Sequence, residues 1–263
     1  MPGVRLAGYD IDGGRVSAAL QRGVIDDAAR SIAELADSTV LVLAVPPGAM
    51  RATLFDCPRE PVVTDVCSTK VRVMEWAAEA GVDLVGGHPL CGREASGPEA
   101  ADATIFEDAP WVLTRPSAEV EELVRAVGAR PVFMEPEQHD RVVAAVSHAA
   151  FVLSAAYMLA VASDPEWEIA AGLAASGFRD MTRLAAGSTE MYAGILETNA
   201  ANIASSLWLV EQELAKIRRH LEHGDTRVAE LLEEARAARE RWEKNAGAQV
   251  RRPPPDAPRS AGR

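Results

Sequence analysis

The sequence lacks two things that would define a function class at once: a cysteine framework and a basic surface. Its three cysteines, Cys57, Cys67 and Cys91, are scattered and have no C-x-x-C spacing. This excludes a disulfide scaffold and a zinc site and favours a reducing cytoplasm. The formal net charge is −12, with no basic run before the tail, so a nucleic-acid partner is not expected.

The chain also lacks a basic-then-apolar leader, and secretion is not expected. One long apolar run, residues 141–162, is long enough to resemble a membrane span. It is rich in alanine and has Ser147 and His148 in its middle. Because polar groups are costly in lipid, the run predicts a helix buried inside protein and no membrane partner.

The first half of the chain alternates short apolar runs with amphipathic stretches. This alternation predicts an α/β domain with a mainly parallel, doubly wound sheet. Helices are expected over Lys70–Gly81 and Ser117–Gly128, the second with Ser117 as its N-cap. The expected strands are Val4–Gly8, Val40–Val45, Pro61–Val66, Asp83–Gly87, Trp111–Thr114 and Pro131–Met134.

Strand signals stop near Glu135, and helical patterns then continue to about Asn245. One of these patterns is a heptad seam, which either packs on its own domain or also meets a twofold mate. We favour a homodimer, with the apolar helix around His148 at the centre of the interface. The seam consists of Ile203, Leu207, Val210, Leu214, Ile217 and Leu221.

Asp10 follows the apolar run Val4–Gly8. A carboxylate in this place is typical of the second strand of a dinucleotide-binding unit, where it accepts hydrogen bonds from the adenosine ribose. That strand should follow a first strand, a G-x-G-x-x-G turn and a helix, but here only three residues precede it. We expect a dinucleotide-binding domain over residues 1–135 that lacks this first unit, a helical domain over 136–245 and a disordered tail over 246–263.

Two loops carry polar clusters. Ser68 and Lys70 follow a buried strand, where ligands sit in open α/β sheets, although such residues are more often solvated or capping. His88 follows two glycines, which let a ligand approach the backbone, and Arg93 and Glu94 add charge. A structural role for His88 is equally open at this point.

The helical half holds two further candidates. His148, in the middle of an apolar helix, is by itself a core histidine. Arg179 and Arg183 lie one helical turn apart, so that both guanidinium groups can face one site. They either bind a carboxylate bidentately or form surface salt bridges.

Together these stretches resemble the prephenate and arogenate dehydrogenases of tyrosine biosynthesis. The resemblance extends from about Val4 to Leu232 in the family's order and spacing. The GGHP…G-x-E-x-SG loop and the GFRD-x-TR helix start are the most specific parts. The matching segments are GYDID, LVLAVPPGAM, VVTDVCSTK, GGHPLCGREASG, IFEDAPWVLTRP, HDRVVAAVSH and SGFRDMTRLAAGSTEMYAGILETN.

The resemblance implies an incomplete Rossmann-type domain followed by an all-helical dimerisation domain. It implies oxidative decarboxylation of prephenate to 4-hydroxyphenylpyruvate, with NAD as the hydride acceptor. The alternative is arogenate as the substrate, which gives tyrosine directly. NADP is less favoured because the charge of Asp10 would repel a 2′-phosphate.

The resemblance also implies residue roles. His88, as a neutral imidazole, would draw the proton from the substrate hydroxyl, and Ser68 would orient both groups beside the nicotinamide. Arg183 would bind a substrate carboxylate with help from His148 and Arg179. The remaining roles are those of Glu94, near the substrate side chain, and of Val45 and Pro46, which would flank the cofactor.

The chain departs from the family at three places. Arg93 stands where a small hydroxyl residue is common, and Ser176 where glycine is usual. The absent first unit would belong either to a longer natural product or to a short relative with weak or no catalysis that keeps the helical dimer and carboxylate pocket. A β-hydroxyacid-type dehydrogenase is disfavoured, because the His148 segment offers no catalytic lysine.

Overall fold

A computed structural model describes residues 3–92 and 101–250 of the chain, with side chains to residue 245. It separates into two compact units, Met1–Leu207 and Trp208–Arg263, and each is described by itself. Among the described residues, no group of three His, Cys, Asp or Glu side chains could hold a metal ion.

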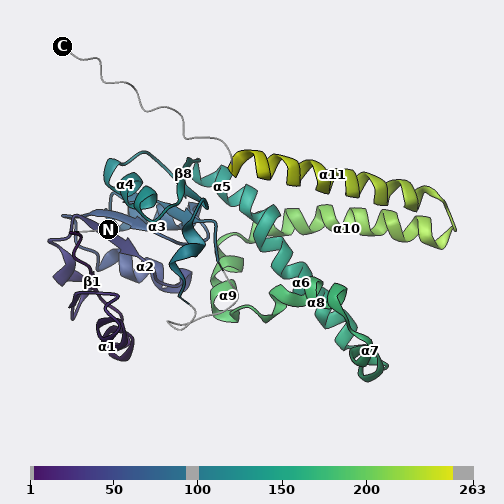
Figure 1. Ribbon diagram of the computed structural model, residues 1–263, viewed down its shortest axis with the longest axis horizontal. Coiled ribbons are helices and arrows are strands. Elements are labelled where there is room, and N and C mark those ends of the chain that lie inside the picture. Colours follow the sequence, from purple (N-terminus) through teal and green to yellow (C-terminus); the bar gives the residue numbers. More distant parts are fainter. Residues whose placement is uncertain (1–2, 93–100, 251–263) are drawn as a thin grey trace, which may run out of the picture. The chain divides into compact units, whose positions relative to one another are not determined.

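The first unit begins with alternating strands and helices, as predicted (Figure 1). Its helices are α1 (Gly13–Gln21), α2 (Pro47–Phe55), α3 (Val71–Ala80) and α4 (Ala118–Ala126), with short 3-10 turns η1 (Ile32–Leu35) and η3 (Ala103–Phe106). Its strands are β1 (Ala7–Gly8), β2 (Asp27–Ala28), β3 (Val40–Leu43), β4 (Val62–Asp65), β5 (Leu84–Val85), β6 (Gly87–Pro89), β7 (Pro110–Leu113) and β8 (Arg130–Phe133).

The predicted strand Val4–Gly8 is shorter and less buried than expected. Only Ala7–Gly8 forms β1, and Val4 and Leu6 are 48% and 51% exposed. Within the described residues β1 pairs with β2 alone, in parallel. A two-stranded ribbon has little apolar surface to bury its own side chains against, so the expectation of a buried strand was wrong.

The strands form three hydrogen-bonded sheets in place of the single sheet that we expected. The orders are β1-β2, β3-β4-β5 and β6-β7-β8. The pairs are parallel except for β6 with β7, which is antiparallel. The expected strand Asp83–Gly87 is divided at Gly86: the part before it pairs with β4, and the part after it pairs with β7.

Close backbone packing explains the two glycines at this division. A Cβ on Gly86 would lie 2.8 Å from the Thr114 side chain, and one on Gly87 would lie 2.4 Å from the carbonyl oxygen of Asp65. Neither distance is tolerable for a side chain. The glycines therefore let the chain pass from β5 into β6, which carries His88.

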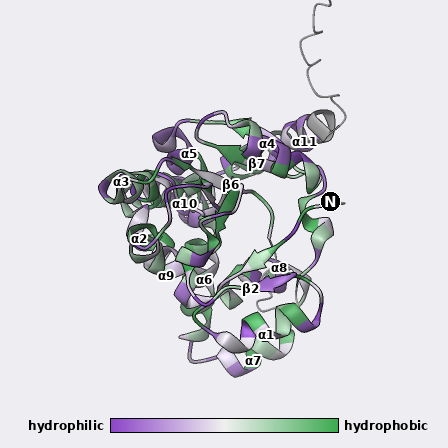
Figure 2. Cartoon of the chain, turned by 90° about the vertical axis from the view of Figure 1, so that its left-hand side faces the viewer, coloured by the Kyte–Doolittle hydropathy of each residue, from purple (hydrophilic) through white to green (hydrophobic). Residues whose placement is uncertain are grey.

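Two apolar clusters hold these sheets. In the first, Leu41 and Leu43 of β3 pack with Met50 and Leu54 of α2 and Val73 of α3. The second joins β5, β7 and α4 and consists of Val85, Trp111, Leu113, Val120, Val124 and Ala129. Figure 2 shows apolar residues concentrated in the strands and polar residues on helices such as α5 (Pro136–Val143).

The chain is helical after β8, as expected. α5 leads through a π-helical turn, η4 (Ala144–His148), into α6 (Ala149–Ala162). The elements that follow in the first unit are α7 (Trp167–Leu173), α8 (Ser176–Thr182), η5 (Arg183–Ala186), α9 (Thr189–Thr198) and the start of α10 (Ala200–Glu222).

The apolar helix Pro136–Ala162 is long and apolar enough to cross a membrane by length and composition, with a third of its best window buried. We expected it to be buried. In the single chain Phe151 and Ser154 are buried, but Leu159 is 72% exposed. The helix therefore leaves an apolar face uncovered in one copy of the chain.

The second unit contains the rest of α10 and all of α11 (Arg227–Val250), which follow one another across a short turn (Figure 1). Gly224 adopts φ +60° between them, and the Asp225 side chain accepts from the Arg227 amide. The helix continues into the predicted tail as far as Val250, because alanines 246 and 248 favour helix. Residues 251–263 lie outside the described part.

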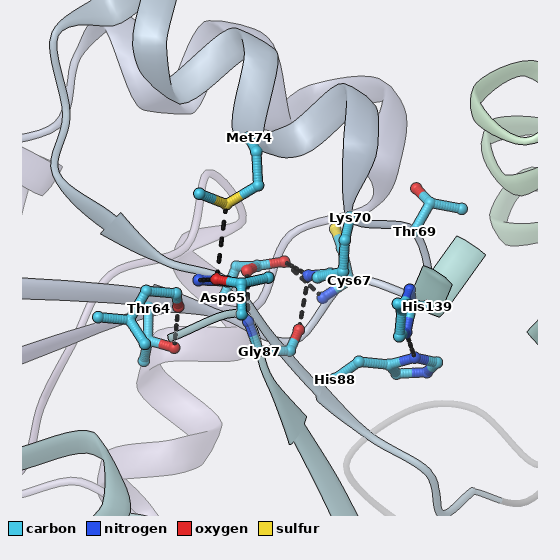
Figure 3. Close-up of polar contacts among 12 residues, drawn as sticks. Thr64, Asp65, Cys67, Thr69, Lys70, Met74, Gly87, His88 and His139 are labelled. Carbon is cyan, nitrogen blue, oxygen red and sulfur yellow. Dashed lines mark hydrogen bonds and ion pairs between the residues drawn. The ribbon is translucent and has the colours of Figure 1, made fainter. Parts of the chain in front are cut away.

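A buried ion pair fixes the chain beside His88. Lys70 and Asp65 are fully buried and pair with each other. The Lys70 Nζ also donates to the carbonyl of Gly87 at 2.6 Å, and Asp65 Oδ1 accepts from the Gly87 amide at 2.9 Å. Both backbone groups of Gly87 are thus held by side chains, Asp65 at the end of β4 and Lys70 at the start of α3 (Figure 3).

Replacing Lys70 with Met should lower the free energy of unfolding by about 3–5 kcal/mol, because it leaves the Asp65 carboxylate buried without a partner. Lys216→Met is the matched control, since Lys216 pairs with Glu213 at an exposed position. It should cost less than about 1 kcal/mol in urea unfolding. Equal losses in the two variants would contradict this role of the ion pair.

Candidate active site

His88 lies in the middle of β6 with its side chain buried. Its Nδ1 is 2.8 Å from Nε2 of His139, and the two rings meet edge to face (Figure 3). Burial holds the pKa of His88 well below its ordinary value, and His139, Lys70 and His148 lower it further. The imidazole is therefore neutral near pH 7 and able to accept a proton.

His139 and Asp140 come from α5, and both are buried. His139 Nδ1 lies 2.8 Å from Asp140 Oδ1. The Asp140 carboxylate also accepts from the backbone amides of Lys70, at 2.7 Å, and Val71, at 2.9 Å. These are the first amides of α3, which have no partner inside their own helix, so α5 supplies the cap of α3.

Asn199, between α9 and α10, connects Asp140 with His148. Its Nδ2 donates to the Asp140 carbonyl at 2.8 Å and to His148 Nδ1 at 3.2 Å, and its Oδ1 accepts from Asn202. Because an amide NH₂ only donates, His148 Nδ1 is an acceptor. In the neutral ring the hydrogen is then on Nε2, a buried donor with no partner among the described residues.

Ser68 lies partly buried in the loop between β4 and α3, next to Thr69 and Lys70. Thr69 shares a hydrogen bond of 2.9 Å with Thr198 of α9. The loop is therefore fastened on both sides of Ser68: Asp65 accepts from the Cys67 amide, and Thr69 meets α9.

Arg179 and Arg183 are exposed, on α8 and η5. Their segment is joined to α6, where the Ala185 amide donates to Ser154 Oγ at 3.1 Å. Among the described residues, the hydrogen bonds that link His88 with His148 pass through His139, Asp140 and Asn199. That one site holds both His88 and Arg183 therefore stays a prediction.

Three of the four residues expected around the cofactor follow strands β1 and β3. Asp10 is partly buried; its Oδ1 accepts from the Asp12 amide at 2.8 Å, and its Oδ2 lies 3.7 Å from Arg15. A carboxylate has about four acceptor positions, so Asp10 keeps capacity for ribose hydroxyls. Val45 is partly buried, and Pro46 is exposed at the start of α2. These residues fit a dinucleotide.

Two predicted site residues, Arg93 and Glu94, lie outside the described residues. The sequence reasoning in turn overlooked His139, Asp140 and Asn199. A signal for the first two was present: His139 and Asp140 stand one turn before Val143 and Ala144, on the face of the helix that is otherwise apolar. Polar residues on a buried helix face need partners and often mark a site.

The arrangement can do two things chemically. It presents a neutral imidazole, His88, whose Nδ1 is hydrogen-bonded to the His139 imidazole, which in turn contacts the Asp140 carboxylate. It also offers the His148 N–H, a donor with no partner in the part of the chain that the structure describes, which suits an anion or a carbonyl. The π-helical turn that ends at His148 fits this reading, because π-turns occur frequently at functional sites.

The free energy of unfolding should fall as the pH falls from about 6.5 to about 4. Burial lowers the pKa of His148 to about 4. In this window the unfolded chain binds a proton that the folded chain does not. The free energy of unfolding therefore becomes smaller as the pH falls, by up to roughly 3 kcal/mol from this group. Chemical unfolding of His148→Gln should show a correspondingly smaller fall.

His223→Gln is the control, because His223 is an exposed histidine of the second unit. It should leave the pH dependence as it is in the wild type. A His148→Gln profile that parallels the wild type from pH 7 to pH 4 would show that His148 is not held neutral by the fold.

Family models match nearly all of the chain. Residues 1–132 match the nucleotide-binding domain of prephenate dehydrogenase, and residues 135–235 match its dimerisation domain. The prephenate dehydrogenase of Bacillus subtilis is 32% identical over 85% of this chain and 65% of its own length. That of Lactococcus lactis is 31% identical over 88% and 68%. The chain thus spans about two thirds of the length of these relatives, and slightly less for the first.

Solved structures agree with this assignment. The prephenate dehydrogenase of Aquifex aeolicus, in complex with hydroxyphenyl propionate and NAD⁺, has 27% identity and a TM-score of 0.80 over 90% of this chain and 88% of that one. The Synechocystis arogenate dehydrogenase has 26% identity and a TM-score of 0.74 over 91% and 92%. The matches confirm a Rossmann-like nucleotide-binding domain followed by a helical dimerisation domain. The chain belongs to the prephenate dehydrogenase family.

Proposed function

We propose that the chain catalyses the oxidative decarboxylation of prephenate to 4-hydroxyphenylpyruvate in tyrosine biosynthesis, with NAD⁺ as the hydride acceptor. The observation that carries the proposal is the buried neutral imidazole of His88, supported by His139 and Asp140, in a chain of this family. The boundary between the two domains is proposed to lie between residues 135 and 136, and the cytoplasm is the proposed compartment.

His88 is the proposed proton acceptor. The substrate hydroxyl must lose its proton as the ring carbon is oxidised, and only a neutral imidazole has a lone pair to take it. The depressed pKa of His88 keeps the imidazole neutral at the pH of the cytoplasm. Ser68, in the loop fastened by Asp65 and Thr69, is proposed to orient the hydroxyl towards His88.

The anionic groups of the substrate are proposed to lie against the helical domain. The His148 Nε2–H is a buried donor without a partner among the described residues, and a carboxylate oxygen would satisfy it. Arg183, with Arg179 one turn before it, is proposed to bind a carboxylate through its planar fork of donors. Glu94 and Arg93 are proposed to face the substrate side chain.

Asp10, Val45, Pro46 and Ser68 are proposed to hold the cofactor, which supplies the hydride acceptor when bound. Asp10 follows β1 with acceptor capacity left for the ribose hydroxyls. Its charge favours NAD⁺, because it would repel a 2′-phosphate. Arg15, 3.7 Å from Asp10, is the one observation in favour of NADP⁺, since a neighbouring arginine can accommodate that phosphate.

Arogenate is the second candidate substrate. The likeness to the Synechocystis arogenate dehydrogenase supports it. The two substrates share the ring carboxylate and hydroxyl and differ in the side chain, which carries an amine in arogenate. The proposed contacts of His88 serve both substrates equally.

A homodimer is the proposed assembly. The match to a dimerisation domain supports it. So does the exposure of apolar side chains along the helices of this domain: Leu159 on α6, and Leu214 and Leu221 on the heptad seam, are 72%, 58% and 63% exposed in the single chain. Burying such residues against a second copy removes apolar surface from water.

Exchanging His88 for Asn should lower kcat by about 10²- to 10⁴-fold and change KM little, because it removes the proton acceptor. Arg183→Ala should mainly raise KM, by about 10- to 100-fold, through loss of a charged hydrogen bond. Stopped-flow production of reduced cofactor, with prephenate or arogenate and with NAD⁺ or NADP⁺, measures these effects and identifies the preferred pair.

Arg125→Ala is the control for the arginine variant. Arg125 pairs with Glu121 on the surface of α4, and its loss should leave both kinetic constants within about twofold. The reverse pattern, with KM raised by the His88 variant and kcat lowered by the Arg183 variant, would contradict the roles proposed. Turnover of neither substrate by the wild-type chain would contradict the function itself.

A further inference from the structure

The Asp140 carboxylate determines where the hydrogen of His139 resides. Its oxygens accept from the amides of Lys70 and Val71, which cannot act as acceptors. The start of a helix favours the ionised carboxylate, and an ionised carboxylate has no hydrogen to donate. His139 Nδ1, 2.8 Å from Oδ1, must therefore be the donor.

The hydrogen positions of His88 follow from this. In neutral His139 the second nitrogen, Nε2, has only a lone pair. It lies 2.8 Å from His88 Nδ1, which must therefore carry the hydrogen of that bond. A neutral His88 then has its lone pair on Nε2, the nitrogen outside this chain of bonds. The two partners thus select one tautomer of His88, the one with a bare Nε2.

We propose that His139 and Asp140 are positioning residues that hold His88 in this tautomer and take over the charge when His88 accepts a proton. The identity of the proton source rests on the proposed function: it is the substrate hydroxyl. The tautomer itself is a property of the resting chain and does not depend on the reaction.

The proton transfer balances without any further reactant. One proton binds to His88 Nε2, and the Nδ1 proton crosses the 2.8 Å hydrogen bond to His139 Nε2. His88 is again neutral, as its other tautomer, and His139 is an imidazolium beside the Asp140 carboxylate. The reverse movement returns the proton from His88 Nε2 to water after the product has left.

The charges around the two rings favour this outcome. Burial disfavours a positive charge on His88 and lowers its pKa, and His139, Lys70 and His148 lower it further. Lys70 is itself neutralised by Asp65. Asp140 is in direct contact with His139 and not with His88. The carboxylate that can pair with a positive charge therefore lies against His139.

The His139→Gln variant separates the positioning of the His88 ring from the transfer of its positive charge to residue 139. The glutamine amide oxygen can accept from His88 Nδ1–H, as His139 Nε2 does, but it cannot take the proton. In the full-length chain we expect kcat to fall by about 10- to 100-fold and KM to stay within about threefold. The acid limb of the pH profile of kcat/KM should move to lower pH. In the variant the positive charge stays on the buried His88 imidazole, because the glutamine cannot accept the proton.

His220→Gln is the matched control. His220 also contacts an aspartate through Nδ1, at 3.0 Å from Asp225 Oδ2, but lies in the second unit. It should leave kcat, KM and the acid limb unchanged. A His139→Gln variant with kcat within twofold of wild type, with an unmoved acid limb, or with a loss in KM alone would overturn the proposal.

Nitrogen-15 NMR of the histidine side chains provides a test without activity. In the wild-type chain without substrate, near pH 7, we expect the hydrogen of His88 on Nδ1 and none on Nε2. A hydrogen on Nε2 would overturn the proposal even if the chain is an active dehydrogenase. The expected tautomer in a chain that turns over neither substrate would refute the proposed function and leave the positioning of His88 in place. If His139→Gln does not fold, the wild-type spectrum decides.

Discussion

The structure of the site depends on one carboxylate. Asp140, on the first helix of the helical part, caps α3 of the sheet-containing part and at the same time accepts from His139. A buried charge of this kind is stable only where donors surround it, and here every donor comes from an element that the site needs. The same contact that fastens α5 to α3 therefore orients the imidazole that faces His88.

A second buried charge, the Lys70 ammonium group, also helps to fix the position of His88. Lys70 follows the β4 loop, and its ammonium group, paired with Asp65, holds the carbonyl of Gly87. The position of His88 is thus set from two sides: its backbone through Gly87 and its ring through His139. Such a fixed geometry lowers the cost of reaching the reactive arrangement, since little has to be ordered during the reaction.

The sequence predicts the broad organisation well and the site in part. Alternating apolar runs placed β3, β4, β7 and β8 within a residue or two, because buried strands have a strong local pattern. Local patterns did not reveal the bend at Gly86, where the strand changes partners, because it follows from contacts with Asp65 and Thr114. His88 and His148 could be selected from motifs. Motifs did not identify three other site residues, His139, Asp140 and Asn199. Their importance depends on partners more than fifty residues away in the chain.

Hydrogen exchange at the start of α3 tests the central claim most directly. If Asp140 caps this helix, the amides of Lys70 and Val71 should exchange about as slowly as those in the core of β4. In Asp140→Ala they should exchange much faster, while the amides of β4 keep their protection. Fast exchange of these two amides in the wild-type chain, or equal protection in both proteins, would contradict the account.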